Sequence, residues 1–153
     1  MEENKTQLKT FSPEKDFTDT YLAMEEVAKR GIKNLVVWGG MGGRLDHTLT
    51  NLFSAAFFAK QGIQIQFQSP TVTIHLIIEN MLLKGTVGDT VSVLALEKAK
   101  GVSLIGFKYL LEDVTLELDK PIGLSNIIAE TDALICVDAG VLAVFHNHLI
   151  KKP

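Results

Sequence analysis

A glycine-rich segment followed by polar side chains is the part of this sequence best suited to chemistry. Residues 39–51 read GGMGGRLDHTLTN and directly follow the apolar segment 35–38. Glycines allow positive φ and a close backbone approach to a ligand, and the N-terminus of a following helix directs N–H groups at the same point. Arg44 adds a forked cation, and Asp46 adds a carboxylate suited to a metal ion or to a helix cap. These residue types indicate a site for a phosphate chain with Mg²⁺.

The segment differs from the two common phosphate-binding loops. A P-loop continues with Gly-Lys-Ser/Thr, whereas this chain has Gly43, Arg44 and Leu45. The dinucleotide-binding pattern GxGxxG is also absent, because Leu45 occupies the position of its third glycine. The alternative is a simple glycine-rich turn with Asp46 as a helix cap. The Arg, Asp, His and Asn side chains within two helical turns favour a binding site.

Composition limits the classes of function. The chain has 153 residues, a formal net charge of −3 and 46% hydrophobic residues, which fits one domain or two small ones. The basic residues are scattered and outnumbered by acids, which argues against nucleic-acid binding. No apolar run has the length of a membrane span, so we expect no membrane partner. The single cysteine, Cys136, cannot form an internal disulfide, and we expect a packed thiol and a cytoplasmic protein.

The N-terminal part has the pattern of an α/β unit. Asp16 or Thr18 can cap a helix that runs to about Arg30, before Gly31. Residues 32–38 predict a strand buried on both sides. Trp38, at its end before the glycine segment, is expected to pack in the core, with lining of the binding pocket as the alternative. Residues 46–61 predict a helix and 63–68 an alternating strand, so the two strands should be parallel. The inward face of the second helix is predicted to carry Leu49, Leu52, Phe53 and Ala56.

The character changes near residue 69, where short alternating segments separated by turn residues begin. These segments, 72–78, 90–96, 114–118, 133–137 and 141–145, predict antiparallel β-structure. The expected fold is therefore a partial parallel α/β sheet with flanking helices in residues 1–68, followed by an antiparallel β-sandwich in residues 69–153. Two parallel strands are few for such a sheet and leave the edge at Val36 and Trp38 uncovered. Either another chain supplies strands or the sequence begins partway through its domain, and the second is expected.

Three motifs together resemble the thiamine pyrophosphokinase family. They are KDFTD at residues 15–19, GGRLDHTLTN at 42–51 and GLSN at 123–126, and the similarity runs from about residue 14 to 144. The resemblance implies transfer of pyrophosphate from ATP to the hydroxyl of thiamine, which gives thiamine diphosphate and AMP. It also implies an α/β domain followed by a β-sandwich, and a homodimer with active sites near the subunit interface.

The resemblance also assigns roles by position. It implies catalytic roles for Asp19, Arg44 and Asp46, with Asp19 and Asp46 serving Mg²⁺. The implied ATP contacts are Lys15, Asp16, Thr18, Arg44, His47 and Asn51, and the implied thiamine contacts are Ser125 and Asn126.

Each of these residues also has a simpler interpretation. Asp16 or Thr18 can act only as a helix cap, and Asp19 can complement the helix dipole. His47 can be an ordinary surface histidine, and residues 125–126 an ordinary turn. The remaining histidines, His75, His146 and His148, show no metal-ligand spacing with a cysteine or an acid in the sequence and are predicted to be structural or solvent-facing.

The chain departs from the family pattern at its beginning. The family carries an aspartate-rich turn of the Gly-Asp-x-Asp-Ser type, and none precedes Pro13. We therefore expect a member that lacks the N-terminal part of its catalytic domain. Two other functions stay open at this point: a catalytically incomplete module that binds thiamine or nucleotide and dimerises, and a diphosphokinase for another alcohol, such as a pterin alcohol.

Overall fold

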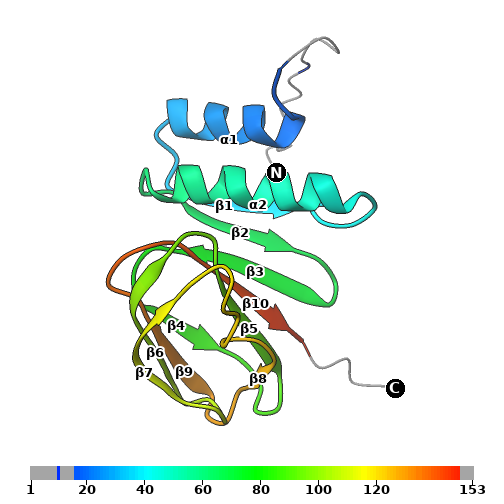
Figure 1. The fold of residues 1–153 in the computed structure, drawn as a ribbon. Helices are drawn as coiled ribbons and strands as arrows, with labels where there is room; N and C mark the ends of the chain where they lie inside the picture. The colour runs from blue at the N-terminus through cyan, green and yellow to red at the C-terminus, as the bar shows by residue number, and fades with distance from the viewer. Residues whose placement is uncertain (1–9, 11–15, 149–153) are drawn as a thin grey trace.

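The computed structural model describes residue 10 and residues 16–148. Figure 1 shows two helices layered over one end of a large sheet, with a smaller sheet packed against the rest of it. In chain order the elements are α1 (Asp19–Lys29), β1 (Asn34–Trp38), α2 (Leu45–Ala59), β2 (Gln64–Gln68), β3 (Val72–Ile77), β4 (Met81–Lys84), β5 (Thr90–Ala95), β6 (Ala99–Ile105), β7 (Leu111–Leu116), β8 (Asn126–Ile127), β9 (Asp132–Cys136) and β10 (Leu142–Asn147).

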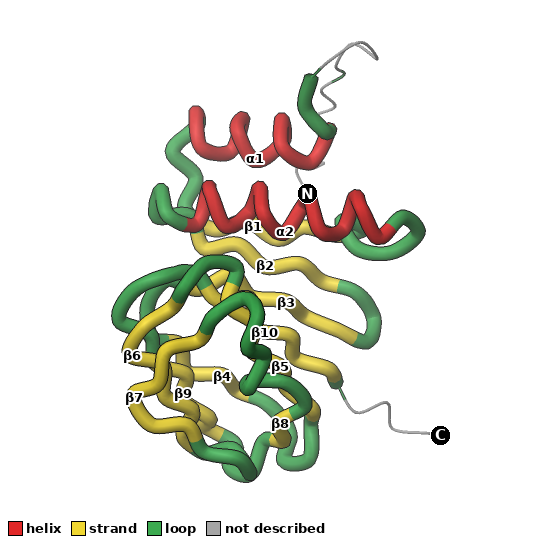
Figure 2. Tube along the Cα trace, in the orientation of Figure 1, coloured by secondary structure: helices red, strands yellow, loops and turns green. Residues whose placement is uncertain are grey.

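The strands form one mixed and one antiparallel sheet. The six-stranded sheet has the order β1-β2-β3-β10-β5-β8, and the four-stranded sheet has the order β4-β9-β6-β7. Only the β1–β2 pair is parallel among these described strands, as the β-α-β pattern predicted. The predicted fold class is confirmed. Because β2 pairs with β3, the large sheet runs without a break across the proposed boundary at residues 68 and 69 (Figure 2), and the division into two domains stays a prediction.

Two hydrophobic clusters hold these layers together. One lies between α2 and the large sheet and includes Phe58, Phe67 and Ile74, all at most 2% exposed. The other lies between the two sheets and includes Val91 and Ile135, which are fully buried. Since strands alternate their faces, the large sheet contributes one face to each cluster. No helix among the described residues is long and apolar enough to cross a membrane.

The predicted burial of α2 and β1 was partly wrong. Leu52 and Ala56 are buried as expected, but Leu49 and Phe53 are 46% and 53% exposed. Trp38, predicted to pack in the core, is 66% exposed, and β1 alternates between exposed and half-buried residues instead of being buried on both sides. The reason is its position: β1 is the edge strand of the large sheet, and α2 covers only one of its faces.

Local signals explain where the helices begin and end. Thr18 caps α1, because its Oγ1 accepts a hydrogen bond from the Tyr21 amide at 3.2 Å. Gly31 follows α1 with φ +68°, and Gly62 follows α2 with φ +82°. Such left-handed positions favour glycine and terminate helices. The sequence signals at both ends of these helices were therefore reliable to within a few residues.

Candidate phosphate-binding site

The glycine segment forms the loop between β1 and the start of α2. Gly39, Gly42 and Gly43 have φ of +73°, +104° and +67°, which other residues rarely adopt. Gly40 is needed for a different reason: a Cβ there would lie 2.8 Å from Val37 Cγ1 and 2.9 Å from Phe67 Cδ1. Backbone conformation and close packing thus both require glycine, and they leave the loop free of side chains at these positions.

Arg44 and Asp46 lie at the beginning of α2 and bind each other. Arg44 donates from Nε to Asp46 Oδ1 at 3.2 Å and from a terminal nitrogen to Oδ2 at 2.6 Å. Asp46 Oδ1 also accepts the His47 amide at 3.0 Å, so the carboxylate satisfies one N–H of the first turn. The hydrogen bonds from Arg44 lower the pKa of Asp46, and the bond to Asp46 raises the pKa of Arg44. Both side chains are exposed and can turn towards an incoming ligand.

A cavity of about 490 Å³ opens beside this loop. It lies where the N-termini of α1 and α2 meet the glycine segment. Five of the polar residues predicted for the site line this cavity together with glycines of the loop, and Thr20, on the first turn of α1, lines it without having been predicted. The lining consists of Thr18, Asp19, Thr20, Gly39, Gly40, Gly42, Arg44, His47 and Asn51.

The other predicted ATP-side residues are placed differently. Asp46 does not line the cavity itself and adjoins it through Arg44. Asp16 is exposed and is not part of the lining. Lys15 lies outside the described residues. Thr18 has both of the roles considered for it, since it caps α1 and lines the cavity.

Asn51 connects the interior of the protein with the glycine loop. Its side chain is only 5% exposed, and its Nδ2 donates to the Gly40 carbonyl at 2.9 Å. Its Oδ1 is buried and has no hydrogen-bond partner. Burying a hydrogen-bond acceptor without a partner costs free energy of folding. A ligand or a water molecule bound beside the atom would supply the missing hydrogen bond. Asn51 therefore fixes the glycine loop at the edge of the cavity.

The oxygen donors at this cavity suit Mg²⁺. Mg²⁺ binds through one or two carboxylates and completes its shell with waters and substrate phosphates. Asp19 lines the cavity and Asp46 adjoins it. Among the described residues, neither carboxylate lies in a cluster of three or more side chains that could together hold a metal ion. Asp19 and Asp46 are thus the residues that could hold such an ion.

The two predicted thiamine-side residues lie in a separate part of the chain: Ser125 ends the loop before β8, and Asn126 is the first residue of β8. Asn126 is 4% exposed, and its amide is used internally: Oδ1 accepts from the Tyr109 and Ile127 amides at 3.0 and 2.9 Å, and Nδ2 donates to the Tyr109 carbonyl. Ser125 is exposed with φ +54°, and its amide donates to Ser92 Oγ at 3.0 Å. Asn126 therefore holds the loop in place, while Ser125 is presented to solvent.

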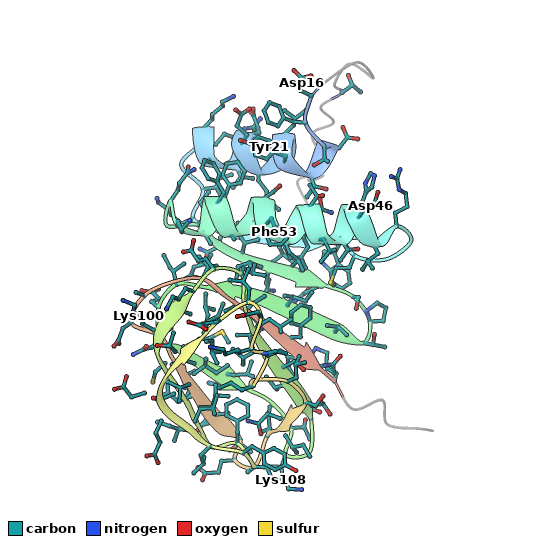
Figure 3. The ribbon with its side chains drawn as sticks, viewed as in Figure 1. Asp16, Tyr21, Asp46, Phe53, Lys100 and Lys108 are labelled. Atoms are coloured by element: carbon teal, nitrogen blue, oxygen red, sulfur yellow. The ribbon has the colours of Figure 1, made fainter. Side chains whose placement is uncertain are left out.

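One chain does not bring the two predicted halves of the site together. In Figure 3, Asp46 lies near the helix layer and Lys108 at the far end of the β-sheets. The Lys108 amide donates to the Ile127 carbonyl at 2.9 Å, which places β8 at that far end. The glycine loop and the Ser125 loop thus lie at opposite ends of the molecule.

Comparison with known proteins identifies two matching family models. Residues 1–67 match "Thiamin pyrophosphokinase, catalytic domain", and residues 75–142 match "Thiamin pyrophosphokinase, vitamin B1 binding domain". Thiamin pyrophosphokinase 1 of Caenorhabditis elegans is 30% identical over 142 residues, covering 80% of this chain and 55% of that protein. This chain thus spans about half the length of that curated relative.

Solved structures with similar folds carry the same description. The thiamine pyrophosphokinase of Bacillus subtilis superposes with a TM-score of 0.80 at 22% identity, covering 89% of this chain and 65% of that one. A thiamin pyrophosphokinase family protein of Enterococcus faecalis gives a TM-score of 0.78 at 28% identity, covering 92% and 68%. The first shows the fold alone. The two family models and the curated relative together show that the chain belongs to the thiamin pyrophosphokinase family.

Proposed function

We propose that this chain supplies the site of a thiamine pyrophosphokinase, which transfers the pyrophosphoryl group of ATP to the thiamine hydroxyl and releases AMP. The observation that carries this proposal is the shared cavity. Two helices and the cap residues that precede them bring polar side chains together at one glycine loop, namely Thr18, Asp19, Arg44, His47 and Asn51. Glycine N–H groups and the N-terminus of α2 favour phosphate at this position. No protein nucleophile is required, because the substrate alcohol attacks the phosphorus.

Positioning and charge neutralisation are the main contributions of the protein to such a transfer. Arg44 can exchange its bond to Asp46 for a two-pronged bond to phosphoryl oxygens as charge develops there. That exchange leaves the Asp46 carboxylate available for a cation. Asn51 keeps the glycine loop in the conformation that receives the phosphates. Thr18 and His47 border the cavity and supply polar contacts to the nucleotide.

Mg²⁺ belongs to the proposal as the ion that accompanies ATP. Asp19 and Asp46 are the residues that would hold it, and their hard oxygen donors match its preference. When bound, Mg²⁺ neutralises charge on the transferred phosphates.

A homodimer completes the proposed site. The Ser125 loop lies at the opposite end of the chain from the glycine loop, so thiamine bound at one and ATP bound at the other require two chains to meet. Exposed apolar side chains lie near Ser125 along the chain or beside Asn126: Ile122 and Leu124 are 57% and 47% exposed, and Tyr109, whose backbone is hydrogen-bonded to Asn126, is 57% exposed. Exposed aromatic and aliphatic groups of this kind favour a protein interface. A cytoplasmic location suits an enzyme that uses ATP, and we include it in the proposal.

A direct assay tests the proposed activity. The purified chain is incubated with ATP, Mg²⁺ and thiamine, and thiamine diphosphate and AMP are measured by chromatography. We expect both products in equal amounts, and we expect Asp46→Asn to abolish them. Replacing thiamine with a pterin alcohol should give no diphosphate ester.

The negative outcomes distinguish the alternatives. Thiamine binding by calorimetry without AMP formation would identify the chain as an incomplete binding module. Product from the pterin alcohol but not from thiamine would assign a different diphosphokinase. Activity that survives both Asp46→Asn and Arg44→Ala would remove the site assignment and leave the family membership unaffected.

A further inference from the structure

A second group of polar side chains lies on the large sheet, on the face opposite α2. His75, His146 and Thr73 project from this face because β3 pairs with β10, with His146 opposite Thr73 and His75 opposite Val144. His148 follows two residues after His146, so both imidazoles lie on the same side of the extended chain. Asp89, in the turn before β5, meets them there.

The contacts in this group are close and largely buried. His146 Nε2 lies 2.7 Å from Asp89 Oδ2, and these residues are 4% and 3% exposed. The His146 and His148 rings have centroids 4.3 Å apart. His148 Nε2 lies 2.9 Å from Thr73 Oγ1, and the Thr86 amide donates to Asp89 Oδ2 at 3.0 Å. Each of the three residues Asp89, His146 and His148 offers one donor atom within 4.8 Å of the other two.

The sequence alone does not reveal this grouping, and the grouping does not contradict the prediction made for these histidines. The histidines were expected to be structural or solvent-facing because the sequence shows no ligand spacing near them. Asp89 is 57 residues from His146 in the chain, and only the pairing of β5 with β10 brings the two together.

An opening to solvent lies beside the cluster. A cavity of about 540 Å³ is lined by Asp89, His146, His148 and His75. Gly85 also lines it, and a Cβ at that position would lie 3.1 Å from His146 Nε2. That Cβ would also lie 2.3 Å from Ile128 Cδ1, so close packing against Ile128 and His146 requires glycine at position 85. The cavity borders the cluster on this side.

We propose that Asp89, His146 and His148 form a binding site for a zinc-type divalent cation, with its remaining coordination position facing the cavity. A tetrahedral ion with donors at about 2.1 Å separates those donors by about 3.4 Å, so the present cluster needs only small side-chain movements. The ion replaces the proton shared between His146 and Asp89, which leaves to solvent. The anionic carboxylate offsets part of the ionic charge.

The chemistry of the donors selects the class of metal. Imidazole nitrogen binds Zn²⁺, Co²⁺ and Ni²⁺ well, whereas Mg²⁺ prefers oxygen donors only. The site is thus separate from the proposed Mg²⁺ position in location and in metal preference.

Equilibrium dialysis against Zn²⁺, and visible absorption with Co²⁺ as a spectroscopic probe, test the site on the full chain without ATP or thiamine. We expect one ion per chain, a Co²⁺ spectrum typical of low coordination number, and no displacement by excess Mg²⁺. His148→Gln should weaken Zn²⁺ binding by roughly tenfold or more. Since His148 lies one residue beyond the end of β10 and is not buried, this variant should fold.

Two further variants make the result specific. Asp89→Asn should also weaken binding, and circular dichroism must show that it folds, because Asp89 is buried. His47→Gln removes an exposed histidine on α2 and should leave Zn²⁺ binding unchanged. Absence of saturable Zn²⁺ binding, or equal affinity in the wild type and His148→Gln, would overturn the proposal. Loss of binding in His47→Gln alone would place the metal at the glycine loop instead. None of these outcomes depends on whether the chain has kinase activity.

Discussion

Arg44 and Asp46 form a two-pronged ion pair at the N-terminus of α2, with N···O distances of 2.6 and 3.2 Å. The side chains are 71% and 63% exposed, so the pair gains little from burial. Asp46 at the same time accepts a hydrogen bond from the first turn of the helix. The pair therefore holds a cation and an anion together at the mouth of the cavity, where a phosphate chain and its metal ion would separate them.

Removal of either partner should reduce catalysis much more than folding. In the assembled enzyme, we expect Arg44→Ala and Asp46→Asn each to lower kcat by roughly a hundredfold or more, the usual effect of losing a preorganised charged contact. Steady-state kinetics and thermal unfolding of the same samples measure the two effects. Lys60→Ala is the matched control, because it breaks an exposed ion pair to Glu97 at 2.9 Å away from the cavity. Equal kinetic losses in Lys60→Ala would contradict the assignment.

Asn51 should act on the nucleotide through the loop. Asn51→Ala leaves the Gly40 carbonyl without its donor, and we expect a loss of about 1 to 2 kcal/mol in the free energy of unfolding. We also expect a higher KM for ATP with an unchanged KM for thiamine. Thr50→Ala, on the neighbouring exposed position of α2, is the control and should change neither KM. A rise in both KM values would indicate general disruption of α2 instead.

The glycines of the loop should respond differently to substitution. Gly43 has φ +67° and open space around it, so Gly43→Ala should cost about 1 to 2 kcal/mol of stability through backbone strain. Gly43→Asn should recover part of that loss, because asparagine tolerates this conformation. At Gly40 the obstacle is the contact with Val37 and Phe67, so asparagine should be no better than alanine. Denaturant unfolding of the four variants distinguishes strain from collision, and recovery by asparagine at position 40 would contradict the packing argument.

Much of the fold could be predicted because its signals are local. Thr18 and Gly31 mark the ends of α1, and strict alternation marks β2, so neighbouring residues were sufficient. The same holds for the candidate site, where Arg44, His47 and Asn51 all follow one glycine segment and now share one cavity. Thr18 and Asp19 were connected to them by resemblance, and the contact between α1 and α2 provides the physical reason for their proximity.

The remaining features depend on long-range packing. Trp38 and Phe53 have apolar side chains, but their exposure follows from the edge position of β1 and the layering of the helices, which periodicity alone does not reveal. The strand β6 was missed because Gly101, with φ +66°, and shifts in register interrupt its alternation. Asp89 and His146 were not connected because their contact depends on pairing between distant strands.

Glu117 should make stability depend on pH in the acidic range. Hydrogen bonds from Lys120 and Lys98, at 2.7 and 3.0 Å, lower its pKa from 4.5 to about 2. A carboxyl with a depressed pKa in the folded state stabilises the protein above its unfolded pKa, and this contribution disappears as the pH falls from 4.5 towards 2. Glu117→Gln should therefore be less stable than the wild type at neutral pH and equal to it in acid. Urea unfolding measures this difference, which should shrink in high salt because both lysines are exposed and Glu117 is only half-buried. A difference in stability that persists in acid would point to packing instead.

Complementation between inactive chains should reveal whether the site spans two copies. Ser125→Arg places a bulky cation in the exposed loop before β8, and Asp46→Asn alters the opposite end of the molecule. If each site takes its glycine loop from one chain and its Ser125 loop from the other, a mixed dimer has one site with both changes and one site with neither. Co-expression of the two inactive variants should then restore roughly a quarter of wild-type turnover, since random pairing makes half the dimers mixed.

Size-exclusion chromatography must show dimers for each variant alone, because failure to associate would also prevent rescue. Two inactive variants that both dimerise but never complement each other would place the ATP and thiamine sites within one chain.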